Sequence, residues 1–219
     1  MLILVLDAST PVVAVAVAKE GEVRAEISIS ARGASEALLP AVHAALNLAG
    51  EDLASVERLL VGVGPGTFTG IRIASATARA LSLSTGAALA KNSTLAALAA
   101  PALSCHTDVL ALLDARRGQV FAQRFSGIDP TTEILCVEPE DLSAEGASLV
   151  VGDGALRYRD ALSALGPIPS DDSPLHRVTA TGHVLSADLT PVSAEELVPI
   201  YVREPDAEVR RDLNPWSRS

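Results

Sequence analysis

The chain has 219 residues, of which 48% are hydrophobic but only 3% aromatic, so its core must consist mainly of Ala, Val and Leu. This length suits one large domain or two small lobes that bury a real core. The formal net charge of −10 disfavours autonomous binding to nucleic acid, because an acidic surface is repelled by the phosphate backbone.

The cysteines and the apolar runs narrow the class further. Cys105 and Cys136 lie in no CxxC or metal-binding pattern, and we expect two buried thiols in a reducing compartment. The apolar runs at residues 2–6 and 12–18 are too short to span a membrane, and no positive charge precedes the first. We therefore expect a cytoplasmic protein without a signal peptide or a membrane span.

The N-terminal part predicts a three-stranded meander followed by a helix. Short apolar or alternating runs, separated by turn formers, indicate strands at residues 2–6, 12–18 and 23–30. A helix is expected from the N-cap Ser35 to about residue 49, with Gly50 as its stop. Pro40 lies inside it and predicts a kink or a later start.

The pattern then becomes one of alternating strands and helices. A strand at 59–63 leads into the glycine-rich loop 64–70, and a helix of small residues at 69–84 ends at Gly86. Ser93 or Thr94 is expected to cap the next helix. Further strands are expected at 89–90, 109–113, 119–125, 134–137 and 149–151, and further helices at 94–100, 155–165 and 175–188.

A weak internal repeat is the most informative organisational feature. Residues 4–8 (LVLDA) and 111–115 (ALLDA) are both apolar strands that end in Asp-Ala, and each is followed by a tight turn and a returning strand. Repeats redefine the expected fold, although a strand ending in Asp also occurs by chance. The repeat predicts an α/β protein with a duplicated ribonuclease-H-like fold, as in the actin, Hsp70 and sugar-kinase superfamily.

The glycine-rich loop does not match the two common phosphate-binding motifs. A Walker A loop needs a Lys that is missing here, and Thr67 occupies the third glycine position of a dinucleotide loop. The alternative is a structural role, in which Gly64 and Gly66 permit a sharp turn and Gly70 allows the helix to pack closely.

The same loop carries a family resemblance. Residues 61–73 (VGVGPGTFTGIRI) resemble the GxGPGSFTGxRIG signature of the TsaB family, also called YeaZ. Other stretches match that family in the same order, so that the resemblance spans about residues 2–203. These stretches are 4–10, 35–40, 114–121, 152–155 and 199–203.

The resemblance implies a function in tRNA modification. TsaB proteins are similar to TsaD, the subunit that attaches threonylcarbamoyl to the adenosine beside the anticodon, but they have a reduced second lobe. The implied role is a non-catalytic scaffold that pairs with TsaD, joined by the ATPase TsaE, with tRNA bound only through the complex. The implied lobes are residues 1–105 and 106–204, with an irregular tail at 205–219.

Catalytic and metal-binding residues are expected to be absent. TsaD carries an HxxxH metal motif after its own Gly-Pro-Gly helix, whereas Thr94 and Leu98 occupy the matching positions here, and neither side chain replaces an imidazole ligand. We expect no cofactor of its own, with ATP or ADP at the interface of the complex left open. Nor does the sequence show an HExxH motif or a recognisable nucleophile–base pair, which a protease would need.

The resemblance implies that two helices contact the partner. Small residues allow close backbone approach and Arg is favoured at interfaces, although each helix must also bury one face on its own sheet. An isolated chain could pair with itself through the same helices. The expected contact residues are Leu38, Leu39, Val42, Leu46, Ile71, Arg72, Ser75, Ala78 and Arg79.

Two alternatives for polar groups stay open. Asp7, Ser9 and Thr10 form either a remnant phosphate hairpin or a simple side-chain turn that closes the first β-hairpin. Arg116 and Arg117 either attract phosphate or are solvated turn residues. The competing function is an autonomous ATP-binding enzyme of the actin and sugar-kinase superfamily.

Overall fold

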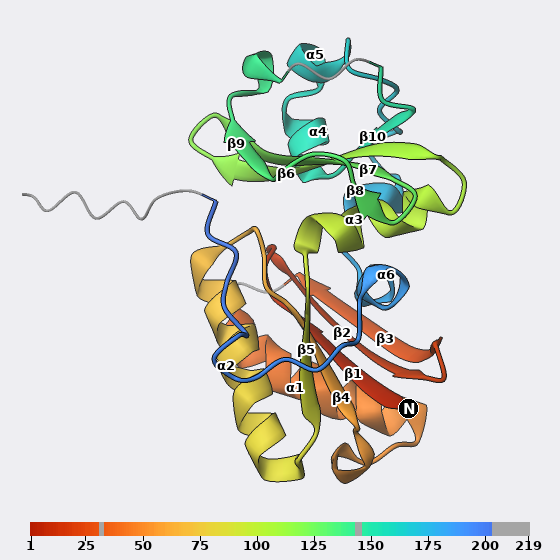
Figure 1. Ribbon diagram of the computed structural model, residues 1–219, viewed down its shortest axis with the longest axis vertical. Coiled ribbons are helices and arrows are strands. Elements are labelled where there is room, and N and C mark those ends of the chain that lie inside the picture. The colour runs from red at the N-terminus through yellow and green to blue at the C-terminus, as the bar shows by residue number, and fades with distance from the viewer. Residues whose placement is uncertain (31–32, 143–145, 203–219) are drawn as a thin grey trace, which may run out of the picture.

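The computed structural model describes residues 1–30, 33–142 and 146–202, so the expected tail at 205–219 and position 203 lie outside the described residues. The described chain forms two lobes, each built on a twisted sheet of five strands, stacked along the long axis of the molecule (Figure 1). No helix in these ranges is long and apolar enough to cross a membrane.

The first sheet has the strand order β3-β2-β1-β4-β5. The first three strands form the expected antiparallel meander, and β1, β4 and β5 run parallel. β1 is buried on both faces because helical layers cover both, which explains its continuous apolar sequence. The bounds are β1 Leu2–Asp7, β2 Val12–Lys19, β3 Glu22–Ser30, β4 Arg58–Gly62 and β5 Ala88–Asn92.

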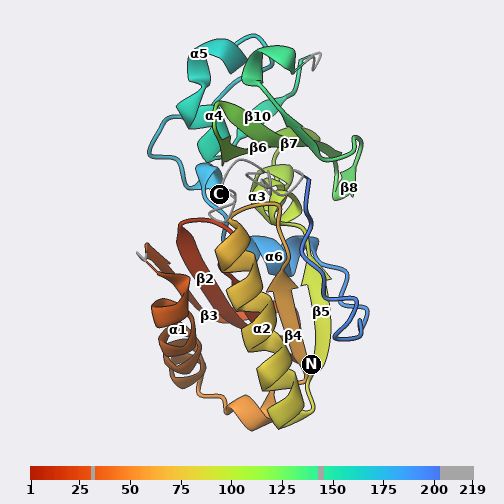
Figure 2. The same cartoon turned by 90° about the vertical axis from the view of Figure 1, so that its left-hand side faces the viewer.

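Helices α1 (Ala34–Ala49) and α2 (Phe68–Thr85) lie side by side across one face of this sheet (Figure 2). Both end at a glycine in the left-handed conformation, Gly50 and Gly86, as the sequence predicts. The start of α1 differs from the prediction. Gly33, not Ser35, is the N-cap, and Pro40 lies inside the helix without delaying its start.

The second sheet repeats the first in reduced form. β6 (Asp108–Arg116) pairs antiparallel with β7 (Gln119–Ser126) and parallel with β10 (Leu149–Val151), as β1 pairs with β2 and β4. The short strands β8 (Asp129–Pro130) and β9 (Leu135–Val137) both pair with β7. The predicted duplicated ribonuclease-H-like fold is confirmed, and the internal repeat at Asp7 and Asp114 marks its two halves.

The polypeptide does not divide into lobes at one point, as the predicted boundary at 105 requires. Helix α3 (Thr94–Leu103) packs against the second sheet although it precedes the boundary. Helix α6 (Ala180–Ser186) covers the face of the first sheet opposite α1 and α2, although it follows the boundary. Residues 180–200 are therefore part of the first lobe, because most of their apolar side chains pack there.

Local structure corrects three further predictions. The helix predicted at 155–165 is broken at Tyr158 into α4 (Asp153–Arg157) and α5 (Arg159–Leu162). The helix predicted at 175–188 shortens to α6, preceded by a single turn. Cys105 is exposed and Cys136 half-buried, so the prediction of two buried thiols is wrong.

The glycine-rich loop packs directly on the first β-hairpin. The Thr67 N–H donates to the Ser9 carbonyl oxygen at 2.6 Å. A Cβ at Gly70 would overlap the Ala8 carbonyl oxygen, and one at Gly66 would overlap that of Ser9. The two glycines are therefore needed because backbone approaches backbone here, and the contact fixes the start of α2 against the end of β1.

Replacing Gly70 by Ala should destabilise the fold by about 3 kcal/mol, because the Ala8 carbonyl must move to admit the methyl group. Chemical denaturation followed by circular dichroism measures the change. Gly33→Ala is the matched control, since a Cβ at Gly33 would meet only the Ser35 hydroxyl at 3.9 Å. Equal stability of the two variants would contradict the packing argument.

Candidate functional site

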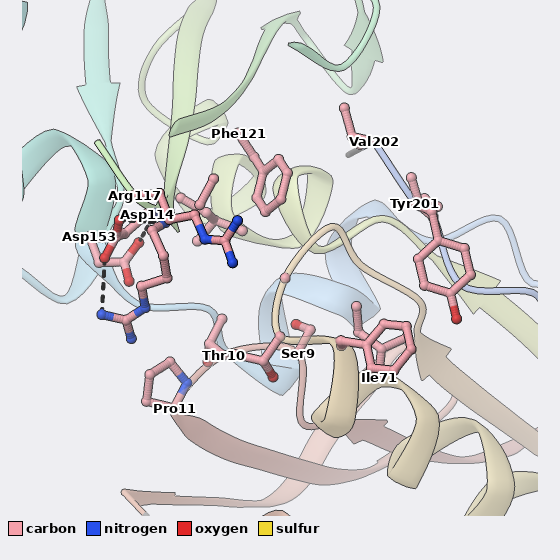
Figure 3. Close-up of a pocket in the computed structure, with 17 residues that line it drawn as sticks. Ser9, Thr10, Pro11, Ile71, Asp114, Arg117, Phe121, Asp153, Tyr201 and Val202 are labelled. Atoms are coloured by element: carbon pink, nitrogen blue, oxygen red, sulfur yellow. Dashed lines mark hydrogen bonds and ion pairs between the residues drawn. The ribbon is translucent and has the colours of Figure 1, made fainter. Parts of the chain in front are cut away.

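A pocket of about 550 Å³ lies between the two lobes (Figure 3). Its walls come from the first hairpin turn, the start of α2, the β6–β7 hairpin, the first residue of α4 and the last described residues of the chain. Ser9 and Thr10 stand on one side, Asp114 and Asp153 on another, and Tyr201 opposite them. This is the position at which two-lobed proteins of this fold class can hold a ligand.

The expected polar residue Asp7 faces away from this pocket into a buried network. His183 Nε2 lies 2.5 Å from Asp7 Oδ2, and the Ser9 N–H and hydroxyl donate to Asp7 Oδ1 at 2.6 and 2.7 Å. Thr94 donates its hydroxyl to Ser9 at 2.9 Å, and Asn92 Nδ2 lies 3.2 Å from His183 Nδ1. Asp7, Ser9 and His183 are each at most 1% exposed.

The network keeps the Asp7 carboxylate charged and occupied. Burial by itself raises the pKa of the Asp7 carboxyl, but the hydrogen bonds from His183 and Ser9 outweigh it and leave the pKa below the ordinary 3.8. Asn92 Nδ2 also donates to Ser186 Oγ at 2.7 Å, so His183 Nδ1 is assigned as the acceptor and Nε2 as the donor to Asp7. Asp7 therefore has no open face toward a ligand or metal ion.

Ser9, His183 and Asp7 include the three residue types of a serine hydrolase, but their connectivity is different. In a catalytic triad the histidine lies between the serine and the acid and takes the serine proton. Here the acid lies in the middle, because both Ser9 Oγ and His183 Nε2 bind Asp7. All three side chains are also buried. The cluster therefore holds chain segments together and is not a nucleophile with its base.

The β6–β7 hairpin has the same kind of turn, but its Asp side chain has different partners. The Arg116 N–H donates to Asp114 Oδ1 at 2.9 Å, as the Ser9 N–H does to Asp7. Asp114 pairs with Arg116 and Arg157 at 3.1 and 3.3 Å, and its N–H donates to Asp153 Oδ1 at 2.9 Å. Burial raises the pKa of the Asp153 carboxyl, and the Asp114 charge adds to the rise. This half of the repeat faces the pocket.

The nine expected partner residues differ in how far their side chains are exposed. Six of their side chains are buried, so in this fold they offer little surface to another chain. Four of the six lie in the core between the two helices and the sheet, and Ile71 lines the pocket between the lobes. The reason is that a helix packed on a sheet buries one of its own faces against that sheet. The six are Leu38, Val42, Leu46, Ile71, Ser75 and Ala78.

Two of the remaining three bind the chain's own C-terminal strap, residues 189–202, which runs beside α2 and β5 (Figure 1). Arg79 Nη2 donates to the Leu197 carbonyl oxygen at 2.8 Å. Arg72 Nε donates to the Tyr201 hydroxyl at 3.1 Å, and its guanidinium carbon lies 3.6 Å from the centre of the Phe68 ring. Leu39 alone of the nine is an exposed apolar side chain.

Comparison with known proteins identifies the family. The family model described as TsaD, tRNA N6-adenosine threonylcarbamoyltransferase, matches residues 23–149. The "tRNA threonylcarbamoyladenosine biosynthesis protein TsaB" of Escherichia coli is 36% identical over 55% of this chain and 53% of its own length. The chain belongs to the TsaB (YeaZ) family. It aligns with about half the length of that curated TsaB protein.

Other relatives are similar over nearly the whole chain. An uncharacterized protein of Mycobacterium tuberculosis H37Rv is 31% identical over 94% of this chain and 93% of its own length. A solved Pseudomonas aeruginosa structure, described as an uncharacterized protein with similarity to peptidase YEAZ, is 25% identical with a TM-score of 0.79. It covers 92% of this chain and 99% of its own. The TsaB fold therefore extends over both lobes.

The positions that correspond to the TsaD metal motif serve other purposes here. Thr94 is fully buried and its hydroxyl binds Ser9, and Leu98 lies in the core between α3 and the second sheet. Among residues 1–30, 33–142 and 146–202, no group of three or more His, Cys, Asp or Glu side chains is placed to hold a metal ion.

Sequence reasoning missed His183, Asn92 and the strap. His183 is separated from Asp7 by 176 positions, and no local pattern connects the two. A useful signal was the glycine that ends β4, Gly62, because a Cβ there would overlap the Asp7 carboxylate.

Replacing Asp7 by Asn should cost about 3 kcal/mol of folding free energy at pH 7, because it removes the charged acceptor of a buried donor. The folded pKa of Asp7 lies below the unfolded value near 3.8, so its contribution is complete above that pH and is lost as the pH falls through the folded pKa. The difference from wild type should therefore narrow only below about pH 4.

Urea denaturation at several pH values tests this pH dependence. The exposed carboxylate Asp52, whose side chain caps no helix, supplies the control variant Asp52→Asn. A cost for Asp7→Asn that is small at pH 7, or that grows as the pH falls, would refute the assignment of a charged Asp7.

Proposed function

We propose that this protein acts in the biosynthesis of threonylcarbamoyladenosine in tRNA, as a non-catalytic subunit that pairs with a TsaD-type chain. The observation that carries the proposal is the outward row Ala76, Ala80 and Leu83 of α2, which is small or apolar although it faces solvent. Leu83 is 89% exposed, and Leu39 on the neighbouring helix α1 is 47% exposed. Soluble surfaces rarely keep such side chains together on neighbouring helices without a partner.

This docking face is defined as the exposed residues Ala76, Ala80 and Leu83 of α2 with Leu39 of α1. Ala76, Ala80 and Leu83 follow at intervals of four and three positions and so share one side of α2. Alanines let a second pair of helices approach closely. The outward residues replace the buried six of the sequence prediction as the contact set, together with Leu39.

A TsaD-type chain is the partner that fits this face. The TsaD family model matches a range that contains both helices, so the partner has the same fold and can present the same pair of helices. Packing of like on like would form a four-helix contact around a pseudo-two-fold axis. The same logic allows a homodimer of this chain when no TsaD-type chain is present.

The non-catalytic part of the proposal rests on the chemistry of the buried residues. Asp7, which would face a nucleotide in an active member of this fold class, is enclosed by His183 and Ser9. Thr94 and Leu98 carry no metal-binding atoms of the kind that an HxxxH motif supplies. The alternative, an autonomous ATP-binding enzyme, would need the Asp7 carboxylate to be accessible.

The net charge of −10 supports binding of tRNA only through the complex, whose other members would include a TsaE-type ATPase. The proposal implies that the protein acts in the cytoplasm. It requires no cofactor bound by this subunit alone. The alternative is that ATP or ADP binds at the interface of the complex.

Leu83→Glu should weaken pairing with a TsaD-type chain at least tenfold, about 1.4 kcal/mol, because a charge is buried in an apolar contact. Its melting temperature should not change, since Leu83 is 89% exposed. Titration calorimetry measures the affinity. The control is Ile128→Glu, a comparably exposed apolar residue at the tip of the second lobe. Loss of affinity in both variants, or in neither, would exclude the docking face.

Transfer of threonylcarbamoyl to tRNA should require this chain in a mixture of TsaD-type and TsaE-type proteins with the adenylate-forming enzyme. The isolated chain should transfer nothing and should give no heat with Mg-ATP. Incorporation of labelled threonine into tRNA measures the first outcome and calorimetry the second. Full activity without the chain would reject the scaffold role, and tight Mg-ATP binding would favour the autonomous enzyme.

A further inference from the structure

The pocket between the lobes has the size of a small-molecule site and lies apart from the docking face. Its volume of about 550 Å³ falls within the range of sites that enclose a drug-sized ligand. Its described lining comes from five separate segments, which distinguishes it from a surface groove along one element. Neither its charges nor its aromatic rings are used in the pairing proposed above.

Aromatic residues are concentrated at this pocket. The chain has only three Phe, two Tyr and one Trp, and three of these six residues line it: Phe68, Phe121 and Tyr201. Ile71 and Ile200 add aliphatic surface. Phe121 also packs in the core of the second lobe, whereas Phe68 and Tyr201 are 51% and 48% exposed. Aromatic faces of this kind favour stacking against a flat apolar body.

The opposite end of the pocket is charged and strained. Arg116 and Arg117 have φ values of 64° and 55°, a left-handed conformation that Asn or Gly adopts at lower cost. Two consecutive arginines in that conformation hold two cationic side chains at one end of the pocket. Backbone strain of this type is retained mainly where a function requires the side chain.

The carboxylates at this end of the pocket do not cancel the positive charge of the arginines. Asp114 pairs with both Arg116 and Arg157, so this group of one carboxylate and two arginines keeps a net positive charge. Burial and the Asp114 charge raise the pKa of Asp153, which favours its neutral form as the pH falls. Figure 3 shows Asp114, Asp153 and Arg117 gathered on one side, with Phe121 between them and Tyr201.

We propose that this pocket binds a small organic anion that has a flat apolar body and a single negatively charged group, without a metal ion. The body would lie among Phe68, Phe121 and Tyr201, and the charged group would face Arg116 and Arg117. A metal-bound triphosphate fits poorly, because the Asp7 carboxylate is enclosed by His183 and the Asp114 carboxylate by two arginines.

Anilinonaphthalene sulfonate, a fluorescent aromatic monoanion, is a direct probe, and phenylnaphthylamine is its matched partner without the sulfonate. The full chain should bind one sulfonate probe at least tenfold more tightly than the uncharged one. The double variant Arg116→Asn and Arg117→Asn should remove that difference, since Asn keeps the left-handed turn but not the charge. Fluorescence titration gives the affinities, and the melting temperature reports on folding.

Two controls separate this pocket from other surfaces. Leu83→Glu changes the docking face and should leave the sulfonate affinity within about twofold, and Arg24→Gln removes a surface arginine outside the pocket with the same expected result. A single variant, Val202→Phe, reduces the pocket volume without touching a charge and should weaken both probes. Because folding is monitored in each variant, a loss of structure is recognised separately.

Three results would overturn the proposal. Equal affinity for the two probes would remove the role of the charge, and a sulfonate affinity unchanged by the double variant would remove the two arginines. Displacement of the probe by ATP only when Mg²⁺ is present would show a metal-dependent nucleotide site instead. Loss of pairing with a TsaD-type chain would leave this result unaffected, so the two proposals fail separately.

Discussion

The buried carboxylate of Asp7 is the constraint on which the arrangement of the molecule depends. It ends β1, binds the following turn through Ser9 and binds α6 through His183, and Ser9 in turn binds the first residue of α3. These elements come from the beginning, the middle and the end of the described chain. A charged group with almost no exposure is tolerated only when every acceptor direction is occupied, so the network and the fold support each other.

The glycine-rich loop extends this constraint to the first helical layer. Its backbone reaches so near Ala8 and Ser9 that Gly66 and Gly70 have no room for a side chain. The start of α2 is thereby fixed to the turn that Asp7 organises. The outward side of α2, with Ala76, Ala80 and Leu83, is then presented at a defined position beside α1. The role of the glycine-rich loop is thus structural, because it fixes the start of a helix.

The two halves of the repeat have diverged in the use of one turn. In both, the carboxylate of an Asp accepts the N–H two residues later. In the first half His183 closes the turn, whereas in the second half arginines surround Asp114 at the edge of a pocket. Duplication provided two copies of a hairpin, and the neighbours of each copy decided its chemistry.

The sequence by itself determined most elements of regular structure. Short apolar or alternating runs indicated the first three strands, Gly50 and Gly86 indicated two helix ends, and the repeated Asp-Ala predicted the duplication. All of these depend on neighbours within a few positions. Only the tertiary structure decided which side chains stay accessible. The sequence pattern of α2 could not separate buried Ala78 from exposed Ala80, and Asp7 could not be assigned before His183 met it, because burial and pairing arise from contacts between segments far apart in the chain.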